Sequence, residues 1–522
     1  MRFNILFGGQ AGQGPNILSV LLGEALIKRG YYVFMSRDYQ SLIRGGHNFN
    51  VLTFSDVPVY SNDSKMDLII ALDENTINVH KKNLKENGHI ISGEGKGNMY
   101  FAGRLFKSLC LDFKILEEQL RELEKRFEEN MKDAKEGYEE EEKTICKVLE
   151  NKKKLFFMNG NKGISEGAIK AGLDIYYAYP MTPATSILHF LAEHKLGVET
   201  IQLENEISVI IAALGSAYAG KRAMVGTSGG GFALMTEGIS FATIAEIPVV
   251  IVNSQRTGPA TGVPTYSGQS DLNFVLNAGH GDIVKFTIAP SNASECYEWG
   301  GRILNLAWKY QTPAVLLIDK EISESTFNLE INTKIEQENN SLWNQEGEYR
   351  RYEITVDGIS PLAFPGHGVV VKTTSYEHDQ SGLTAEESEE DITAMQEKRL
   401  RKFESMKEEV DNMEDAIKIF GKKDSKNILV TFGSSTSPSI EAAENFDLKV
   451  VQIIVMEPFP IIQVTEAIGE DATNVICVEQ NALGQLASLL SKNGIEANEL
   501  ILKYSSRALQ KGEIEDLLKE IL

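Results

Sequence analysis

The chain has 522 residues, of which 42% are hydrophobic and 24% are charged, and its formal net charge is -22. One hydrophobic core seldom supports such a length, so we expect about three domains. The negative charge argues against a nucleic-acid partner, because phosphate binding requires a basic face. The first residues, MRFNILFGG, read as a strand entering a glycine turn, and no apolar stretch is long enough to span a bilayer. These features predict a cytoplasmic protein with no membrane role.

Residues 1–154 are predicted to form an α/β domain that ends in an acidic helical connector. Short apolar segments typical of strands alternate with helical spacing at 16–28. The predicted strands are 3–7, 32–35, 50–54, 68–71 and 89–92, which suggests a βαβ sheet. From 106 to 154, acidic and helix-favouring residues dominate, as on solvated helix faces.

Two motifs in this first domain could bind an anion. GGQAGQG follows a strand and opens a helix, so the backbone at Gly12 and Gly14 could approach a phosphate. In IRGGHNFNV, Arg44 could pair with a phosphate or a carboxylate. A tight turn needed only for packing, and an arginine that braces its loop, explain these motifs equally well. A nicotinamide site fits poorly, because neither Glu24 nor Asp38 lies at the end of the second strand.

Residues 155–330 are predicted to form a second α/β domain whose loops carry most of the candidate chemistry. AYPMTPATSI follows a strand, and its prolines stiffen a loop around Thr182. By itself this is a rigid helix entry, but it could also hold an oxygen ligand in a fixed position. QLENEISVII places Glu204 and Glu206 at the start of an apolar helix with many small residues. The helix dipole explains one such carboxylate, whereas one facing the apolar layer could share a proton with a buried ring nitrogen.

Two further glycine-rich loops follow strands of the second domain. TSGGGFALMTEG, from Thr227, ends a strand and opens a helix, and its consecutive glycines indicate a close approach to the backbone. QRTGPATGVPT contains Arg256, the best candidate in the chain for gripping a substrate carboxylate. All these loops are expected to leave the same end of a parallel sheet, where open α/β sheets bind ligands.

The rest of the chain is predicted to be a linker over 331–425 and a third α/β domain over 426–522. The linker is polar and poorly periodic, with a charged helix near 387–413, and part of it could be disordered. The fold class is therefore α/β, with three α/β domains in series. The four cysteines form no CxxC pair, so the sequence has no signature of a zinc site or an iron–sulfur cluster, and no metal site is expected in this chain.

Together the motifs resemble a known family. The series YPMTP, ENE, TSGGGF and QRTGPATG is similar to the pyrimidine-binding domain of the alpha subunit of 2-oxoacid:ferredoxin oxidoreductases, particularly the 2-oxoglutarate type. GGQAGQG and IRGGHN resemble the gamma domain of that family, fused here ahead of alpha. FGSST, MEPFP and VEQNALGQL resemble its transketolase carboxy-terminal-like domain, and EHDQSG in the linker is also family-like. The resemblance covers nearly the whole chain.

The resemblance implies roles for individual residues. Glu206 corresponds to the glutamate bonded to the pyrimidine nitrogen of thiamine diphosphate, with Glu204 as the second choice. Tyr179 and Thr182 match the YPxTP loop beside the substrate, with Thr182 near the reacting carbons and so catalytic, and Arg256 matches the arginine expected to hold the 2-oxoacid carboxylate.

The glycine segment is assigned in the same way. Thr227 and Ser228 would contact substrate, and Gly229 and Gly230 would contact the cofactor. Gly230 stands where the family has proline, so the loop is expected to be more flexible. The first domain, through Gly12, Gly14 and Arg44, is a possible coenzyme A site by the same resemblance.

The sequence also lacks features that the reaction requires. No GDG motif occurs, although thiamine enzymes use one to bind the diphosphate and Mg²⁺, and no cysteine set for an iron–sulfur cluster occurs. The resemblance therefore implies a beta subunit that carries the diphosphate, Mg²⁺ and a cluster, and ferredoxin as the electron acceptor. The implied reaction, a step of anaerobic metabolism, converts a 2-oxoacid and coenzyme A to acyl-coenzyme A, CO₂ and reduced ferredoxin.

Three other functions explain the motifs less well. A nicotinamide dehydrogenase leaves YPMTP, ENE and TSGGGF unexplained. A non-catalytic scaffold does not require Glu206, Thr182 and Arg256 together. A stand-alone decarboxylase lacks the diphosphate motif. The sequence does not distinguish 2-oxoglutarate from pyruvate or a branched-chain 2-oxoacid, because such specificity depends on a few pocket contacts.

Overall fold

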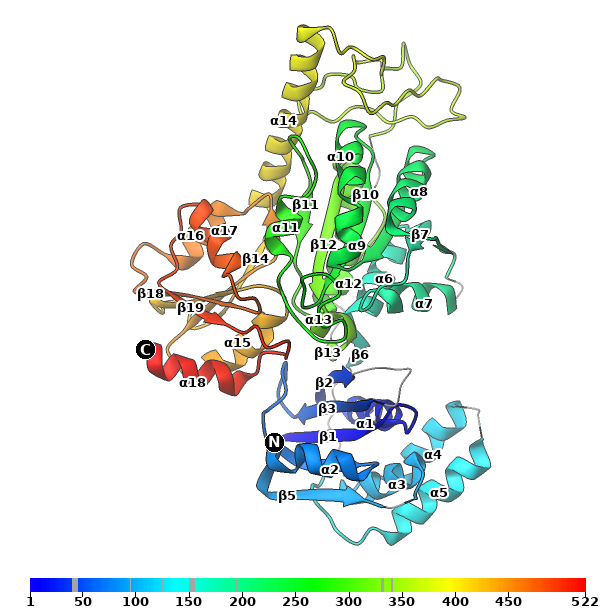
Figure 1. The fold of residues 1–522 in the computed structure, drawn as a ribbon, viewed down its shortest axis with the longest axis vertical. Helices are drawn as coiled ribbons and strands as arrows, with labels where there is room; N and C mark the ends of the chain where they lie inside the picture. The colour runs from blue at the N-terminus through cyan, green and yellow to red at the C-terminus, as the bar shows by residue number, and fades with distance from the viewer. Residues whose placement is uncertain are drawn as a thin grey trace. The chain divides into compact units, whose positions relative to one another are not determined.

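The computed structural model describes residues 1–39, 46–93, 95–123, 126–149, 155–193, 196–329, 333–338 and 341–522. The chain divides into two compact units. The first comprises Met1–Asn159, Glu324–Asn332 and Leu509–Leu522, and the second comprises Gly160–Ser323 and Thr333–Ala508. Within the described residues the first unit holds one sheet and the second holds two, which confirms the α/β fold class with three sheets (Figure 1). The domain boundaries after residues 154, 330 and 425 stay predictions.

The sheet of the first unit has seven strands in the order β5-β4-β1-β3-β2-β13-β6. They are β1 (Arg2–Gln10), β2 (Tyr32–Tyr39), β3 (His47–Ser55), β4 (Met66–Ala71), β5 (Leu84–Ser92), β6 (Phe156–Asn159) and β13 (Thr326–Leu329). β1 runs parallel to β4 but antiparallel to β3, and β2 is antiparallel to β3. The sheet is therefore mixed and not a simple βαβ array. Apolar segments in sequence do not reveal strand direction, which depends on how the chain crosses over.

Helices of the acidic run pack onto this sheet's core. The helices of this unit's first part are, in chain order, α1 (Pro15–Lys28), α2 (Glu74–His80), α3 (Asn98–Ser108), α4 (Phe113–Glu122) and α5 (Phe127–Glu140). The acidic run contains α4 and α5. Leu116, Leu120 and Ala134 belong to the buried core. A Cβ at Gly103 would lie 1.9 Å from the Ala134 carbonyl oxygen, so α3 and α5 touch through their backbones. The charged residues of the run thus cover one side of helices whose other side is buried.

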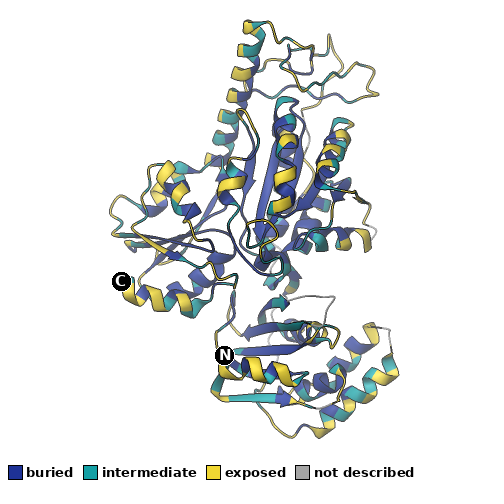
Figure 2. Cartoon of the chain, viewed as in Figure 1, coloured by how far each residue is buried: buried dark blue, intermediate teal, exposed yellow. Residues whose placement is uncertain are grey.

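The larger sheet of the second unit has the order β17-β11-β12-β10-β9-β7-β8. Its strands are β7 (Ile175–Ala178), β8 (Glu199–Gln202), β9 (Ala223–Thr227), β10 (Val249–Gln255), β11 (Phe286–Ile288), β12 (Pro313–Asp319) and the antiparallel edge strand β17 (Val455–Glu457). Every residue of β9, β10 and β12 is buried, as expected for parallel strands covered on both faces (Figure 2). The helices that matter for the site are α7 (Thr185–Glu193), α8 (Glu206–Tyr218), α9 (Gly229–Leu234) and α10 (Thr236–Ile244).

The third sheet has the order β14-β16-β15-β18-β19. β15 (Asn427–Thr431), β18 (Asn474–Glu479) and β19 (Glu499–Leu502) are parallel, and β14 (Ile417–Gly421) runs antiparallel to β16 (Lys449–Ile453). α17 (Gln485–Lys492) follows β18. Of the helices among the described residues, none is long and apolar enough to cross a membrane.

The segment between the second and third sheets is anchored to the second unit. It ends in the long helix α14 (Glu389–Asp411), close to the predicted charged helix. Lys398 and Lys402 of this helix form buried ion pairs with Glu246, the first at 2.7 Å. In the EHDQSG motif, His378 stacks on Tyr352 with ring centroids 3.7 Å apart. This family-like motif therefore serves packing of the segment.

Candidate active site

The loops after β7, β9 and β10 meet at one end of the larger sheet. Ala178 pairs with Gly226, and Asn253 pairs with Thr227, so the carboxyl ends of these strands lie side by side. The Arg256 guanidinium donates from Nη1 to the Thr182 carbonyl oxygen at 2.7 Å. The structure thus brings together two of the predicted site residues that are far apart in sequence, and the expected convergence of the loops is confirmed.

Glu206 lies at the first position of α8 with its side chain buried. Its exposed fraction is 3%, and its Oε1 atom has no hydrogen-bond partner in the part of the chain that the structure describes. Asn205 caps the helix by accepting a hydrogen bond from the Ser208 N–H at 2.9 Å, so Glu206 is not needed as the cap. Glu204, in contrast, is exposed and accepts a hydrogen bond from the Ser208 hydroxyl. Of these two carboxylates, only that of Glu206 is directed into the protein.

The three glycines of TSGGGF form the first turn of α9, and each has a different environment. A Cβ at Gly231 would lie 2.1 Å from Thr227 Oγ1 and 2.5 Å from Glu206 Oε1, so this glycine lets the Glu206 carboxylate sit against the helix. A Cβ at Gly229 would lie 2.4 Å from a carboxylate oxygen of Asp271. Gly230 is exposed, and a Cβ there would meet no heavy atom within 4 Å. The position where the family has proline therefore has room for a side chain.

Several buried polar atoms at this end of the sheet have no hydrogen-bond partner among the described residues. They include Glu206 Oε1, Ser228 Oγ and Asn253 Oδ1. Ser228 occupies the cap position of α9, yet its side chain makes no capping hydrogen bond. Buried polar groups without partners cost about 1–3 kcal/mol each, so such a cluster is typical of a site that a polar ligand completes. An acceptor carboxylate with hydroxyl and amide groups around it fits an aminopyrimidine ring.

The remaining predicted residues of the second unit lie around this cluster. Tyr179 directly follows β7, and its side chain is 40% exposed. Thr182 is partly exposed, and α7 begins at Thr185, whose N–H donates to the Met181 carbonyl oxygen at 3.1 Å. Thr227 is fully buried, with its hydroxyl directed toward Met181 Sδ at 4.0 Å. Tyr179 and Thr182 therefore line the accessible side, and Thr227 lies behind it.

Comparisons with known proteins agree with this geometry. A family model described as pyruvate flavodoxin/ferredoxin oxidoreductase, thiamine diphosphate-binding, matches residues 166–398, and one described as pyruvate ferredoxin/flavodoxin oxidoreductase matches residues 4–98. The 2-oxoacid:ferredoxin oxidoreductase subunit alpha of Sulfolobus sp is 29% identical over 100% of this chain and 97% of the relative. The 2-oxoglutarate synthase subunit KorA of Methanocaldococcus jannaschii is 31% identical over 67% of this chain and 94% of the relative. The chain belongs to the 2-oxoacid:ferredoxin oxidoreductase family.

A solved structure of the same family supports the assignment. The 2-oxoglutarate:ferredoxin oxidoreductase from Magnetococcus marinus, with 2-oxoglutarate, coenzyme A and succinyl-CoA bound, matches 99% of this chain and 99% of that chain with a TM-score of 0.90 at 26% identity. This chain is thus an alpha subunit of a 2-oxoacid:ferredoxin oxidoreductase, an oxidoreductase with ferredoxin as acceptor. Residues 166–398 form the part of the chain that matches the thiamine diphosphate-binding model of this family.

In this alpha subunit the amino-terminal glycine motif joins β1 to α1. Gly14 is the cap residue of α1 with φ 90°, and no side chain caps that helix. A Cβ at Gly14 would lie 2.5 Å from Asn98 Nδ2, so packing and backbone conformation both require glycine. Gly12 has φ 96° and open space around it. Arg44, the third residue predicted for coenzyme A, lies outside the described residues.

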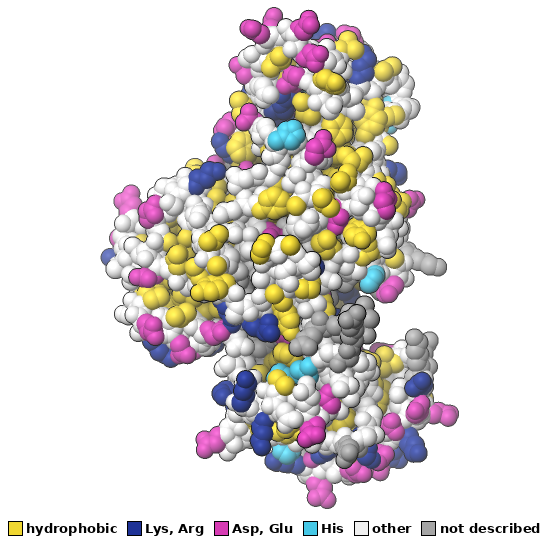
Figure 3. Space-filling view, viewed as in Figure 1, with side chains coloured by type: hydrophobic (Ala, Val, Ile, Leu, Met, Phe, Trp, Pro, Cys, Tyr) yellow, Lys and Arg dark blue, Asp and Glu magenta, His cyan; other side chains and the backbone are white. Residues whose placement is uncertain are grey.

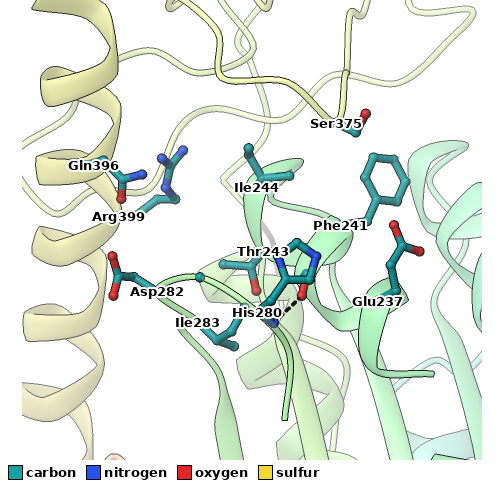
Figure 4. A pocket seen from close by; sticks show the side chains of 12 residues that line it. Glu237, Phe241, Thr243, Ile244, His280, Asp282, Ile283, Ser375, Gln396 and Arg399 are labelled. Carbon is teal, nitrogen blue, oxygen red and sulfur yellow. Dashed lines mark hydrogen bonds between the residues drawn. The ribbon is translucent and has the colours of Figure 1, made fainter. Parts of the chain in front are cut away.

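The alpha subunit also has a hollow away from these motifs. It is lined by residues of α10, the loop around His280, Ser375, and Gln396 and Arg399 of α14 (Figure 4). The His280 N–H donates to the Ser240 hydroxyl at 2.8 Å, and Arg399 is already paired with Glu377. None of the predicted site residues lines this hollow. No group of His, Cys, Asp and Glu side chains suited to a metal ion occurs among the described residues.

Sequence reasoning missed two residues of the site, Asn253 and Asp271. Asn253 is a polar residue in the buried strand VVIVNSQ, and that was a usable signal, because a buried amide needs a partner. Its Nδ2 donates to the Asp271 carboxylate at 3.3 Å. Asp271 lies in an irregular segment with no recognisable motif, so only the folded chain brings it to the loops of the site.

Proposed function

We propose that this alpha subunit, together with a beta subunit, oxidatively decarboxylates 2-oxoglutarate with coenzyme A to succinyl-coenzyme A, CO₂ and reduced ferredoxin. The substrate is inferred from the names of the relatives in Methanocaldococcus jannaschii and Magnetococcus marinus. The observation that carries the proposal is the buried carboxylate of Glu206, which has an unpartnered oxygen at the ligand-binding end of the sheet. The four cysteines are free thiols, in keeping with a cytoplasmic location.

The residues at this end of the sheet fit the pyrimidine half of thiamine diphosphate. When bound, that cofactor supplies a carbanion for attack on the 2-oxo carbon and an electron sink for loss of CO₂. Glu206 would share a proton with the pyrimidine nitrogen N1′, and the backbone at Gly229 and Gly230 would border the ring. The carboxylate is suited to this role because its buried Oε1 accepts no hydrogen bond from the described residues.

Substrate contacts would come from the loops that converge on this site. Arg256 would hold the 2-oxoacid carboxylate, since a guanidinium offers a planar pair of donors. Its present contact with the Thr182 carbonyl oxygen fixes it beside the YPMTP loop. Tyr179 and Thr182 would border the reacting carbons, with Thr227 and Ser228 behind them. These side chains orient the substrate, and the loops around them restrict access of water.

The beta subunit would cover α8 and bring the groups that this chain lacks. No GDG motif is present, so Mg²⁺, the diphosphate and an iron–sulfur cluster are assigned to that partner. Ile207 and Ile211 of α8 are 53% and 43% exposed, and Gly215 has no heavy atom within 4 Å of a Cβ position. These residues share one helix face next to Glu206. Hydrophobic side chains also gather on the face of the second unit that carries α9, α10 and α11 (Leu272–Leu276) (Figure 3).

The first domain would contribute to coenzyme A binding. α1 has no side-chain cap and no acidic residue in its first turn, so its amino terminus favours an anion such as a phosphate. Gly12 offers open backbone beside it. Arg44, which lies outside the described residues, stays the predicted cation of this site.

The test is turnover by the co-expressed alpha–beta complex with Glu206→Gln, against Glu204→Gln as a matched control. We expect Glu206→Gln to reduce ferredoxin reduction with 2-oxoglutarate by about 100-fold or more, because general acid–base catalysis contributes that much. Glu204→Gln should stay within about twofold of wild type, because that side chain is exposed and outside the cluster. Gel filtration would show that both variants assemble. Near-normal turnover of Glu206→Gln, or no activity of wild type with any 2-oxoacid, would contradict the proposal.

A further inference from the structure

The third domain forms several hydrogen bonds with a short segment of the second domain, residues 269–273. The Ser435 hydroxyl and the Gln480 N–H both donate to Gln269 Oε1, at 2.7 and 2.9 Å. From α17, Gln485 donates to the Ser270 carbonyl oxygen at 2.8 Å. These partners belong to FGSST and VEQNALGQL, two of the third-domain motifs to which the thiamine site gives no role. The Asn273 N–H donates to Gln485 Oε1 at 2.9 Å, so the segment is held from the third-domain side on both flanks of Asp271.

Asp271 connects this fastened segment to the active-site loops. Its N–H donates to Gln255 Oε1 at 2.9 Å, and its carboxylate accepts from Asn253 Nδ2 at 3.3 Å. The same carboxylate supports the backbone of Gly229, where a Cβ would lie 2.4 Å from Oδ2. Gln255 and Asn253 lie in β10, directly ahead of Arg256. One carboxylate thus contacts both the glycine turn and the strand that carries the arginine.

We propose that Asp271 is a positioning residue for Arg256, and that the FGSST and VEQNALGQL motifs of the third domain hold Asp271 in place. The inference rests on the proposed role of Arg256 in binding the 2-oxoacid carboxylate. Asp271 acts on Arg256 through opposite charge and through the shared β10 end. Without the Asp271 carboxylate, the Arg256 guanidinium keeps its contact with the Thr182 carbonyl oxygen but loses the negative charge that orients it.

The titration of Asp271 provides a signature. Burial raises its pKa to about 6, although the hydrogen bond from Asn253 and the charge of Arg256 act in the opposite direction. Among the described residues, Arg256 is the charged group that acts on it, and its other neighbours, Asn253, Gln255 and Gly229, are neutral. The negative charge is therefore present at neutral pH and is lost as the pH falls below about 6. We expect kcat/KM for the 2-oxoacid, which reports the free enzyme, to decrease in that range.

The experiment measures steady-state kinetics of the assembled alpha–beta complex with Asp271→Asn across the pH range. At neutral pH, KM for the 2-oxoacid should rise about tenfold with a smaller change in kcat, because binding orientation and not proton transfer is altered. The acid limb of kcat/KM near pH 6 should disappear in the variant. Asp282→Asn is the control, since that aspartate is exposed in a loop outside the site.

Gln485→Met tests the part of the third domain. This substitution removes the hydrogen bond to the Ser270 carbonyl oxygen while keeping the side-chain length, so KM for the 2-oxoacid should rise, as in Asp271→Asn. The effects of Gln485→Met and Asp271→Asn should be less than additive, because both act through one segment. Additive effects would refute the role of the third domain, and an unchanged KM and pH profile in Asp271→Asn would refute the positioning role. Activity of the wild-type complex decides the proposed function separately.

Discussion

The variant Glu246→Gln would leave two buried ammonium groups without a counter-charge. The side chains of Lys398 and Lys402 are 0% and 3% exposed, and both pair with Glu246, which is itself 1% exposed. Burial alone would raise the pKa of Glu246, but the two lysines hold that pKa well below its ordinary range. The carboxylate therefore joins the turn that follows α10 to α14 as a charged group.

The magnitude follows from this geometry. Removing one partner of a buried ion pair costs about 3–5 kcal/mol, because the other charge stays buried and unpaired. For the second unit, which has roughly 340 residues, that lowers the unfolding midpoint by roughly 4–7 °C. Lys398→Met should cost less, because it removes a charge together with its desolvation and leaves Glu246 paired with Lys402. Glu397→Gln is the matched control on the same helix, since its pair with Arg401 is exposed.

Tryptophan fluorescence during thermal and urea unfolding provides the assay. All three tryptophans, Trp299, Trp308 and Trp343, lie in the second unit, so the signal reports the part of the chain that α14 packs on. Protease cleavage within residues 341–388 should also become faster in Glu246→Gln, because that segment leads into α14. A midpoint for Glu246→Gln equal to that of Glu397→Gln would refute the reasoning.

Two further perturbations concern the site itself. Gly231→Ala should lower the free energy of unfolding by about 1–3 kcal/mol and displace Glu206, because the new Cβ would overlap Glu206 Oε1. Gly230→Ala places its Cβ in open space and should change the free energy of unfolding in urea by no more than about 0.5 kcal/mol. Equal midpoints for the two glycine variants would contradict the close approach. Ile211→Asp should abolish co-elution with the beta subunit while the fold measured by circular dichroism is kept, because the side chain is exposed on α8. Retained co-elution would place the partner elsewhere.

The strands of the second and third domains could be predicted closely from sequence. β9 (223–227) and β18 (474–479) are short apolar runs bounded by glycine or polar residues, which is the sequence pattern expected of buried parallel strands. The sequence also predicted that the loops after β7, β9 and β10 leave the same end of the sheet, because parallel strands place their carboxyl ends together. Strand direction in the first sheet did not follow, because β2 and β3 turn back antiparallel within a pattern that fits either direction.

Contacts made by polar side chains over long distances could not be predicted. Glu246 and Lys398 are 152 positions apart, and each on its own resembles a solvated charge. The same is true of Asp271, whose importance depends on Gly229 and Asn253 lying beside it. A periodic pattern reports which face of an element is buried, but not which distant charge is buried with it.

The choice between Glu204 and Glu206 shows what the folded chain adds. Both carboxylates stand near the start of the same helix, and the sequence ranks them only by resemblance. In the structure one is exposed and bonded to Ser208, while the other is buried with an unpartnered oxygen beside a face of α8 that exposes Ile207 and Ile211. An unpartnered buried oxygen and an uncovered aliphatic surface are both unfavourable for a chain alone. A cofactor and a partner subunit arriving at the same end of the sheet would satisfy both at once, so binding of the two should be mutually favourable.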